Sequence, residues 1–175
     1  MANWFRGVAV GGAGPSGADR HDFLPGLYLS NDEFVAEIYA TKRDSNPKNQ
    51  RVLRADIPDT TIGPIFDLTT GKWGKAWSAY EQEGLPSFNN RQIMSTNVGS
   101  RGGYGQLFKA FIDRHGINLD QYSAILGWEY LQPKRDGSLS KQLCIRNPSV
   151  AAQGGKGLNG SSMSARNLPP GNWAN

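Results

Sequence analysis

Few side chains in this sequence could act as a nucleophile, a base or a metal ligand. Cys144 is the only cysteine, so an intrachain disulfide and a cysteine-rich zinc site are excluded, and two histidines are too few for most histidine-built metal sites. The apolar neighbours of Cys144 favour a small core residue over a catalytic thiol. A Ser-His-Asp triad would need His21 or His115, and His115 ends a predicted helix, where it would interact with the helix dipole. We therefore expect no metal site and no triad hydrolase.

The short motifs of common enzymes are also absent from the sequence. The chain contains no Gly-x-Ser-x-Gly elbow, no Walker loop, no His-Glu-x-x-His and no Cys-x-x-Cys. The run Gly11-Gly12-Ala13-Gly14 suggests a phosphate-binding loop, but neither a Lys-Ser/Thr pair nor a helix signal follows it. The net charge of +4 permits an anionic ligand or a nucleic acid without requiring either, because the basic residues do not cluster.

Length and composition indicate one loop-rich domain. A chain of 175 residues with 22 glycines and 10 prolines favours an α+β or mainly β domain over a helix bundle. Residues 151–175 are rich in Gly, Ser and Asn and contain no acidic residue, so we expect a tail that is disordered, extended or ordered only by a partner. No apolar stretch approaches the roughly 20 residues that cross a bilayer, and residues 1–6 lack the features of a signal peptide.

Hydrophobic periodicity predicts the elements that must position a site. Helices are expected after the capping residues Asn31 or Asp32, over 72–82 with tryptophans as core anchors, and over 104–115 with a stop at Gly116. Loops are expected over 11–17 and 91–103. Strands are predicted by alternating or continuous apolar residues over 3–10, 26–30, 51–57, 65–68, 122–131 and 142–146.

Two segments near the start resemble a known family when they are taken together. Phe5-Arg6-Gly7 is similar to the opening "Tyr-His/Arg-Gly" motif of ADP-ribosyltransferases of the His-Tyr-Glu-like group, and residues 22–31 are similar to the "Asp-Phe-Gly-x-Gly-x-Tyr-Leu-Ser/Thr" motif that follows it. Later segments resemble, in order and spacing, the ADP-ribosyltransferase-like C-terminal toxin domains of bacterial polymorphic (Rhs-type) toxins. These segments are 51–58, 65–68, 104–108 and 125–130.

The resemblance covers roughly residues 4 to 150 and implies both a fold and a division of the chain. It implies an α+β fold with a mixed, mostly antiparallel, split β-sheet core and flanking helices. Residues 1–150 would form a single catalytic domain, and 151–175 the tail. NAD would be bound as a substrate, with no metal.

The resemblance also implies roles for individual residues. Breaking the nicotinamide glycosidic bond develops positive charge on the ribose, so a site must hold the ribose and pyrophosphate and stack the nicotinamide. Arg6 would bind the ribose or a phosphate, and the backbone of Arg6-Gly7 would pair with the carboxamide, where the small Gly7 lets the ligand approach. Tyr28 would stack on the nicotinamide ring, with Ser30 beside the cofactor. Arg6 as a surface ion-pair partner and Tyr28 as a half-buried strand aromatic are the structural alternatives.

The third catalytic residue has two candidates. In the family a Glu, Asp or Gln on a late strand contacts the ribose hydroxyls. Gln142 matches by its position on the last strand, whereas Glu129 is the only nearby carboxylate on a predicted strand. Gln142 can hydrogen-bond a hydroxyl but cannot stabilise a cation by charge, so both residues are kept.

A different alignment would use other residues of the chain. It pairs Arg54 with Ser95-Thr96-Asn97 and Glu129, which is similar to the Arg-Ser-Glu group of the same enzymes. The segment Ser95-Thr96-Asn97 departs from the usual Ser-Thr-Ser, and residues 26–28 would then lie too early.

The resemblance implies an antibacterial effector of interbacterial competition. It would be a glycosyltransferase-class toxin, part of a larger secreted protein, that transfers ADP-ribose from NAD to a protein or RNA in the cytoplasm of a target cell. A cognate immunity protein would neutralise it. Two alternatives stay open, namely an NAD glycohydrolase toxin and a non-catalytic binding module of a phage or a secretion system.

Overall fold

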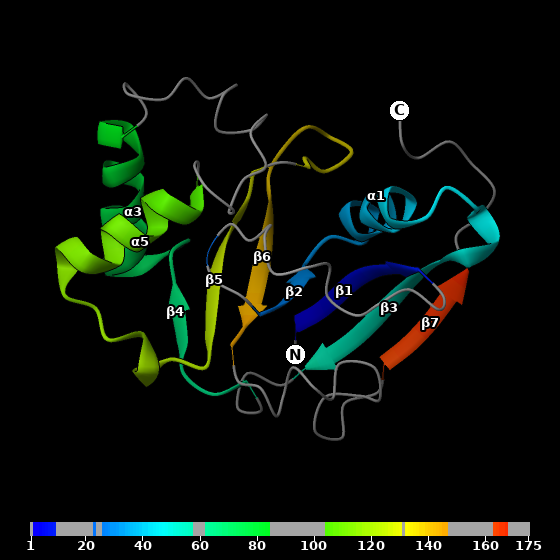
Figure 1. Ribbon diagram of the computed structural model, residues 1–175, viewed down its shortest axis with the longest axis horizontal. Helices are drawn as coiled ribbons and strands as arrows, with labels where there is room; N and C mark the ends of the chain where they lie inside the picture. Colours follow the sequence, from blue (N-terminus) through cyan, green and yellow to red (C-terminus); the bar gives the residue numbers. More distant parts are fainter. Residues whose placement is uncertain are drawn as a thin grey trace.

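Strands from all parts of the chain form one mixed sheet (Figure 1). The computed structural model describes residues 2–9, 23, 26–57, 62–84, 104–130, 132–146 and 163–167. Within these residues the sheet has seven strands in the order β4-β5-β6-β2-β1-β3-β7, and only β4 and β5 run parallel. The strands are β1 Ala2–Ala9, β2 Leu27–Ser30, β3 Gln50–Ile57, β4 Ile65–Asp67, β5 Ala124–Glu129, β6 Ser140–Ile145 and β7 Met163–Asn167.

Three longer helices flank this sheet. Helix α1, Glu33–Arg43, lies along β1 and β3, whereas α3, Gly71–Gly84, and α5, Tyr104–His115, pack together beside β4 (Figure 1). These elements confirm an α+β fold with a mixed, mostly antiparallel sheet and flanking helices. None of the helices in the described part of the chain is long and apolar enough to span a membrane.

The predicted elements agree with the observed ones to within a few residues. Strand β5 starts at Ala124 instead of residue 122 because the short 3-10 helix Leu119–Gln121 holds the preceding turn. The predicted loops at 11–17 and 91–103 lie outside the described residues. In the segment 151–175 the structure describes the strand β7, which pairs with β3, so the expectation for the tail as a whole stays a prediction.

Helix α1 packs unusually close to β1. Asp32 caps the helix by accepting a hydrogen bond from the N–H of Val35 at 3.0 Å. Gly7 of β1 lies under the helix, where an added Cβ would overlap the carbonyl oxygen of Ala36 and come within 2.5 Å of the backbone nitrogen of Ala40. Glycine at this position is therefore required by the approach of two backbones.

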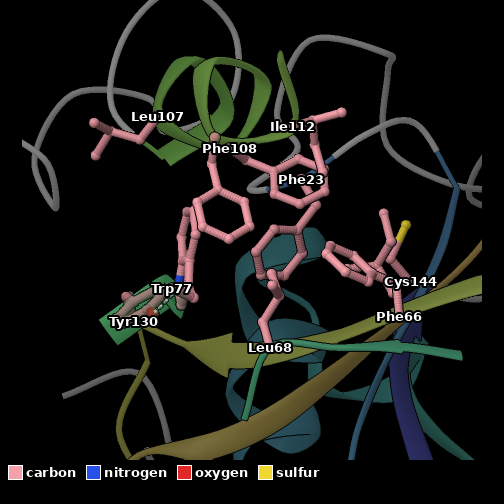
Figure 2. Close-up of a cluster of buried hydrophobic side chains, with 11 residues drawn as sticks. Phe23, Phe66, Leu68, Trp77, Leu107, Phe108, Ile112, Tyr130 and Cys144 are labelled. Carbon is pink, nitrogen blue, oxygen red and sulfur yellow. Dashed lines mark hydrogen bonds between the residues drawn. The ribbon is translucent and has the colours of Figure 1, made fainter. Parts of the chain in front are cut away.

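A large aromatic cluster joins α3 and α5 to the sheet. Figure 2 shows the α5 side chains Leu107, Phe108 and Ile112 above the side chains of Phe66, Leu68 and Cys144. Trp77 of α3 donates through Nε1 to the hydroxyl of Tyr130 at 3.0 Å, and that hydroxyl donates to Oε1 of Glu81 at 2.7 Å. The polar atoms of this apolar cluster are thus paired, and the end of β5 is tied to α3. The prediction of Cys144 as a core residue is confirmed, since it is fully buried.

The opposite face of the sheet has an apolar layer of its own. Side chains from β1, β2, β5 and β6 share it with Ile62, and all are buried: Trp4, Leu27, Leu29, Ala124, Leu143 and Ile145. Because alternate residues of a strand point to opposite faces, the central strands are apolar along much of both faces. Buried polar residues on these strands therefore stand out from their surroundings.

The helix α3 begins at a hydrogen-bonded turn. Asp67, the last residue of β4, accepts bonds from the N–H and hydroxyl of Thr69, both at 2.7 Å, and from the hydroxyl of Thr70 at 2.8 Å. Burial on its own would raise the pKa of the Asp67 carboxyl, but these hydrogen bonds outweigh it and hold the pKa below its ordinary value.

Replacing Gly7 tests the close packing of α1 on β1. The substitution Gly7→Ala forces the helix backbone away from the strand, so we expect the free energy of unfolding to fall by about 3 kcal/mol, the upper part of the range for overpacked cores. Urea denaturation measures this change. Asn3→Ala, on the same strand and face but exposed, is the control and should change stability by less than about 0.5 kcal/mol. Equal stability of the Gly7→Ala variant and the wild type would contradict the observed packing.

Candidate active site

Four buried polar residues form a patch on one face of the sheet. Ser30 of β2 lies opposite Gln142 of β6, and Ser140 of β6 lies opposite Glu129 of β5. Because directly opposed residues share a face and alternate residues return to it, all four side chains emerge on the same side. All four are buried: Ser30 is 8% exposed, Gln142 4%, Ser140 0% and Glu129 5%. We call Ser30, Glu129, Ser140 and Gln142 the polar patch.

The polar patch lies between helix α1 and the pair α3 and α5, which cover the same face of the sheet. It occupies the C-terminal ends of β2 and β5 and the N-terminal end of β6. On the same face, the aromatic cluster under α3 and α5 includes Ile125 and Cys144, while α1 covers Phe5 of β1. The patch is thus a buried polar region between two apolar clusters.

Hydrogen bonds fix the side chains of two residues of the polar patch. The amide nitrogen of Gln142 donates to the carbonyl oxygen of Trp128 at 2.9 Å. Oε1 of Glu129 accepts from the N–H of Gln132 at 3.3 Å. The Gln142 amide therefore ties β6 to β5, and Glu129 supplies the single ionisable group among the four residues of the patch.

The Glu129 carboxylate is linked to α1 through the turn that follows β5. Gln132 donates to it from the backbone and accepts, at its side-chain oxygen, a bond from Nζ of Lys42 at 3.1 Å. In the same turn, the guanidinium of Arg135 lies 4.7 Å from the ring centre of Phe34 on α1. These contacts hold the β5–β6 connection against α1 beside the patch.

Tyr28 shares the face of the polar patch. It lies opposite Cys144, two residue pairs along from Ser30 and Gln142, and is half-buried against the aromatic cluster. Its hydroxyl accepts a hydrogen bond from the N–H of Phe23 at 3.2 Å. The structure thus places Tyr28, Ser30, Glu129 and Gln142 on one face of three neighbouring strands, with Tyr28 four residues along the ladder from the level of Glu129.

The ring of Phe23 is held directly over the backbone of β5. An added Cβ at Gly127 would overlap this ring and lie 2.6 Å from its Cε2 atom. The ring also makes edge contacts with Phe108, with centroids 5.1 Å apart, and with Trp77 at 6.5 Å. Phe23 therefore anchors the chain that reaches Tyr28, and Gly127 makes room for it.

Arg6 is buried at the junction of β1 and β2, on the other face. It lies two residues from Trp4 in a strand that pairs with β3 without a break, so its side chain emerges opposite that of Phe5. Its Nη1 donates to the carbonyl oxygen of Tyr28 at 3.2 Å. Strands β1 and β2 pair at Phe5 and Ser30. The structure joins Arg6 to the backbone of Tyr28, and does not bring its side chain to the face of the polar patch.

Gly7 has a structural explanation that was not anticipated. We expected its small size to let a ligand approach, whereas the space above its Cα is filled by the backbone of α1. Its glycine identity therefore follows from helix packing.

The alternative set built on Arg54 is spread across the sheet. Arg54 lies in β3, where its Nη2 donates to Asn3 at 3.3 Å, and Glu129 lies in β5. Strands β6, β2 and β1 separate them, which at 4.7–4.9 Å per strand is about 19 Å. Ser95-Thr96-Asn97 lies outside the described residues. The arrangement does not favour this set.

Ser140 is a member of the patch that the sequence interpretation missed. The predicted strand began at Gln142, whereas β6 begins two residues earlier. Counting back from Gln142 by the period of a strand would have placed Ser140 on its face. Gln132 was also missed, because a backbone N–H carries no sequence signal.

We also compared the chain with known proteins. The chain matches no protein-family model, no curated protein and no solved structure. In the part of the chain that the structure describes, no group of three or more His, Cys, Asp or Glu side chains could hold a metal ion.

A double variant tests the contact between Phe23 and Gly127. Gly127→Ala places a methyl group inside the ring of Phe23, so we expect a loss of about 1–3 kcal/mol in the free energy of unfolding. Phe23→Leu shortens the obstructing side chain, and the combined variant should therefore be more stable than the sum of the two single changes predicts. Strict additivity of the two changes in chemical denaturation would show that the residues do not contact one another.

Proposed function

We propose that this chain is an antibacterial effector toxin domain that transfers ADP-ribose from NAD to a macromolecular target, a protein or an RNA, in a recipient cell. The observation that carries the proposal is the polar patch with Tyr28 beside it. The family resemblance selected Tyr28, Ser30, Glu129 and Gln142 from distant segments, and the fold gathers these four on one face of three neighbouring strands.

The chemistry of the patch suits cleavage of a glycosidic bond. In the proposed reaction the bond between ribose C1′ and the nicotinamide nitrogen breaks, and both of its electrons leave with nicotinamide, which becomes neutral. C1′ then bonds to an oxygen or nitrogen of the acceptor, whose proton passes to a base. Glu129 is the carboxylate that can stabilise the cationic ribose and take this proton. Gln142 would hold a ribose hydroxyl.

Tyr28 and Arg6 would act on either side of β2. A half-buried ring on the face of the patch can stack on the nicotinamide, and the hydrogen bond from Phe23 restricts its orientation. Arg6 lies on the other face, so it would act on the site through the backbone of Tyr28, to whose carbonyl oxygen its guanidinium donates.

Burial of the patch has a consequence for substrate binding. Its four residues are at most 8% exposed, so binding of NAD would require a rearrangement around them. A closed site of this kind strengthens electrostatic interactions and keeps water from the reactive ribose. This exclusion of water favours transfer to an acceptor over hydrolysis.

The biological setting follows from the same proposal. The domain would belong to a larger secreted toxin, be carried into the target-cell cytoplasm by a delivery apparatus, and be neutralised by a cognate immunity protein. The net charge of +4 is compatible with either an RNA or a protein as the acceptor.

Incubation with NAD labelled in the adenylate part and with a cell lysate tests the activity. We expect release of nicotinamide and transfer of the label to a macromolecule. Glu129→Gln keeps the shape of the side chain and removes its charge, so the rate should fall at least about 100-fold. Tyr28→Ala and Arg6→Ala should also lose activity. The matched control is Glu83→Gln, an exposed glutamate paired with Arg114 on the surface, which should leave the rate unchanged.

The other outcomes separate the alternatives. Nicotinamide release without a labelled macromolecule would identify an NAD glycohydrolase. Neither release nor stabilisation by NAD in a thermal unfolding assay would indicate a non-catalytic module, because a site filled at 100 times its Kd adds about 2.7 kcal/mol. Salt-sensitive labelling of nucleic acid would indicate an RNA target.

A further inference from the structure

We propose that Ser140 binds a hydroxyl group of the substrate ribose together with Glu129. This inference rests on the proposed function and extends it by one residue that no sequence motif indicates. It starts from an unusual hydroxyl group at the centre of the polar patch.

The Ser140 hydroxyl is buried and poorly satisfied. Its exposed fraction is 0%, and among the described residues its hydroxyl has one partner, the hydroxyl of Ser30 at 3.5 Å. This distance is at the outer limit for such a bond, since O–H···O distances centre on about 2.7–2.8 Å. Ser30 in turn accepts from the N–H of Asp32 at 3.1 Å and donates to Ser140. The O–H of Ser140 therefore keeps its donor capacity, and buried polar groups in proteins are nearly always paired.

The position of Ser140 indicates which kind of ligand group could bond to its hydroxyl. It lies directly opposite Glu129 on β5, where Cβ atoms of paired residues are about 4.5–5.5 Å apart. A carboxylate accepts hydrogen bonds only, whereas a serine hydroxyl both donates and accepts. A sugar hydroxyl between them can donate to Glu129 and accept from Ser140. Two neighbouring hydroxyls of one ribose ring can do the same, with one donating to Glu129 and the other accepting from Ser140.

The surroundings favour a sugar over other ligands. Gln142, the diagonal neighbour of Glu129, adds an amide that can bond a hydroxyl, and the half-buried ring of Tyr28 lies two residue pairs further along the strands, at the next position on the same face. A diol recognised by a carboxylate, a hydroxyl and an amide, with a flat ring beside it, matches a ribose attached to a nicotinamide.

Ligand binding by Ser140→Ala tests the inference. Isothermal titration compares NAD with two analogues that lack either the 2′- or the 3′-hydroxyl of the nicotinamide ribose. We expect Ser140→Ala to bind NAD about tenfold more weakly, which corresponds to about 1.4 kcal/mol. One of the analogues should bind the variant and the wild type equally, because it lacks the hydroxyl that Ser140 contacts. Thermal unfolding of the variant should match that of the wild type, because little bonding is lost.

Two controls keep the test decisive. Ser138→Ala removes an exposed hydroxyl of the same connection, one that bonds to Asp136, and should leave NAD binding unchanged. If Ser140→Ala does not fold, Ser140→Cys keeps the volume with a poorer hydrogen-bonding group and should also weaken binding.

Two failures can be distinguished. A wild-type protein that binds no NAD overturns the proposed function and this inference with it. A wild type that binds NAD, with Ser140 variants of equal affinity and no coupling to either analogue, overturns the role of Ser140 alone.

Discussion

The pairing of β6 with both β2 and β5 is the constraint on which the site depends. One antiparallel register sets Ser30 against Gln142, and the other sets Glu129 against Ser140. A slip of one residue in either ladder would turn the polar side chains to the apolar face of Leu29 and Leu143. The apolar layers on both faces make such slips costly, so the same burial that stabilises the sheet also fixes the members of the patch.

The polar patch is stabilised by its neighbours and adds little stability of its own. Its hydroxyl contact is long, and burying the carboxylate of Glu129 costs desolvation free energy that its hydrogen bonds must offset. The aromatic cluster under α3 and α5 and the close packing of α1 on Gly7 supply rigid walls on either side. Buried polar residues that lie between well-packed apolar clusters are typical of functional sites.

Most elements could be predicted from the sequence because periodicity and capping are local signals. Asp32 as a helix cap and the alternating residues of β3 and β6 are examples. Strand order and register could not be predicted, since they join residues about 110 apart. That is why Arg6 was grouped with Tyr28 although their side chains emerge on opposite faces, and why β7 was not expected. Ser140 was missed for a local reason, because the predicted strand began two residues too late.

A crystal structure of the chain with an NAD analogue whose glycosidic bond resists cleavage would show directly whether the polar patch binds NAD. We expect the nicotinamide ribose on the polar patch, with a hydroxyl oxygen within about 3.2 Å of the Glu129 carboxylate and the nicotinamide ring against Tyr28. An analogue bound on the opposite face, beside Trp4, or at any site away from Glu129 would contradict this expectation.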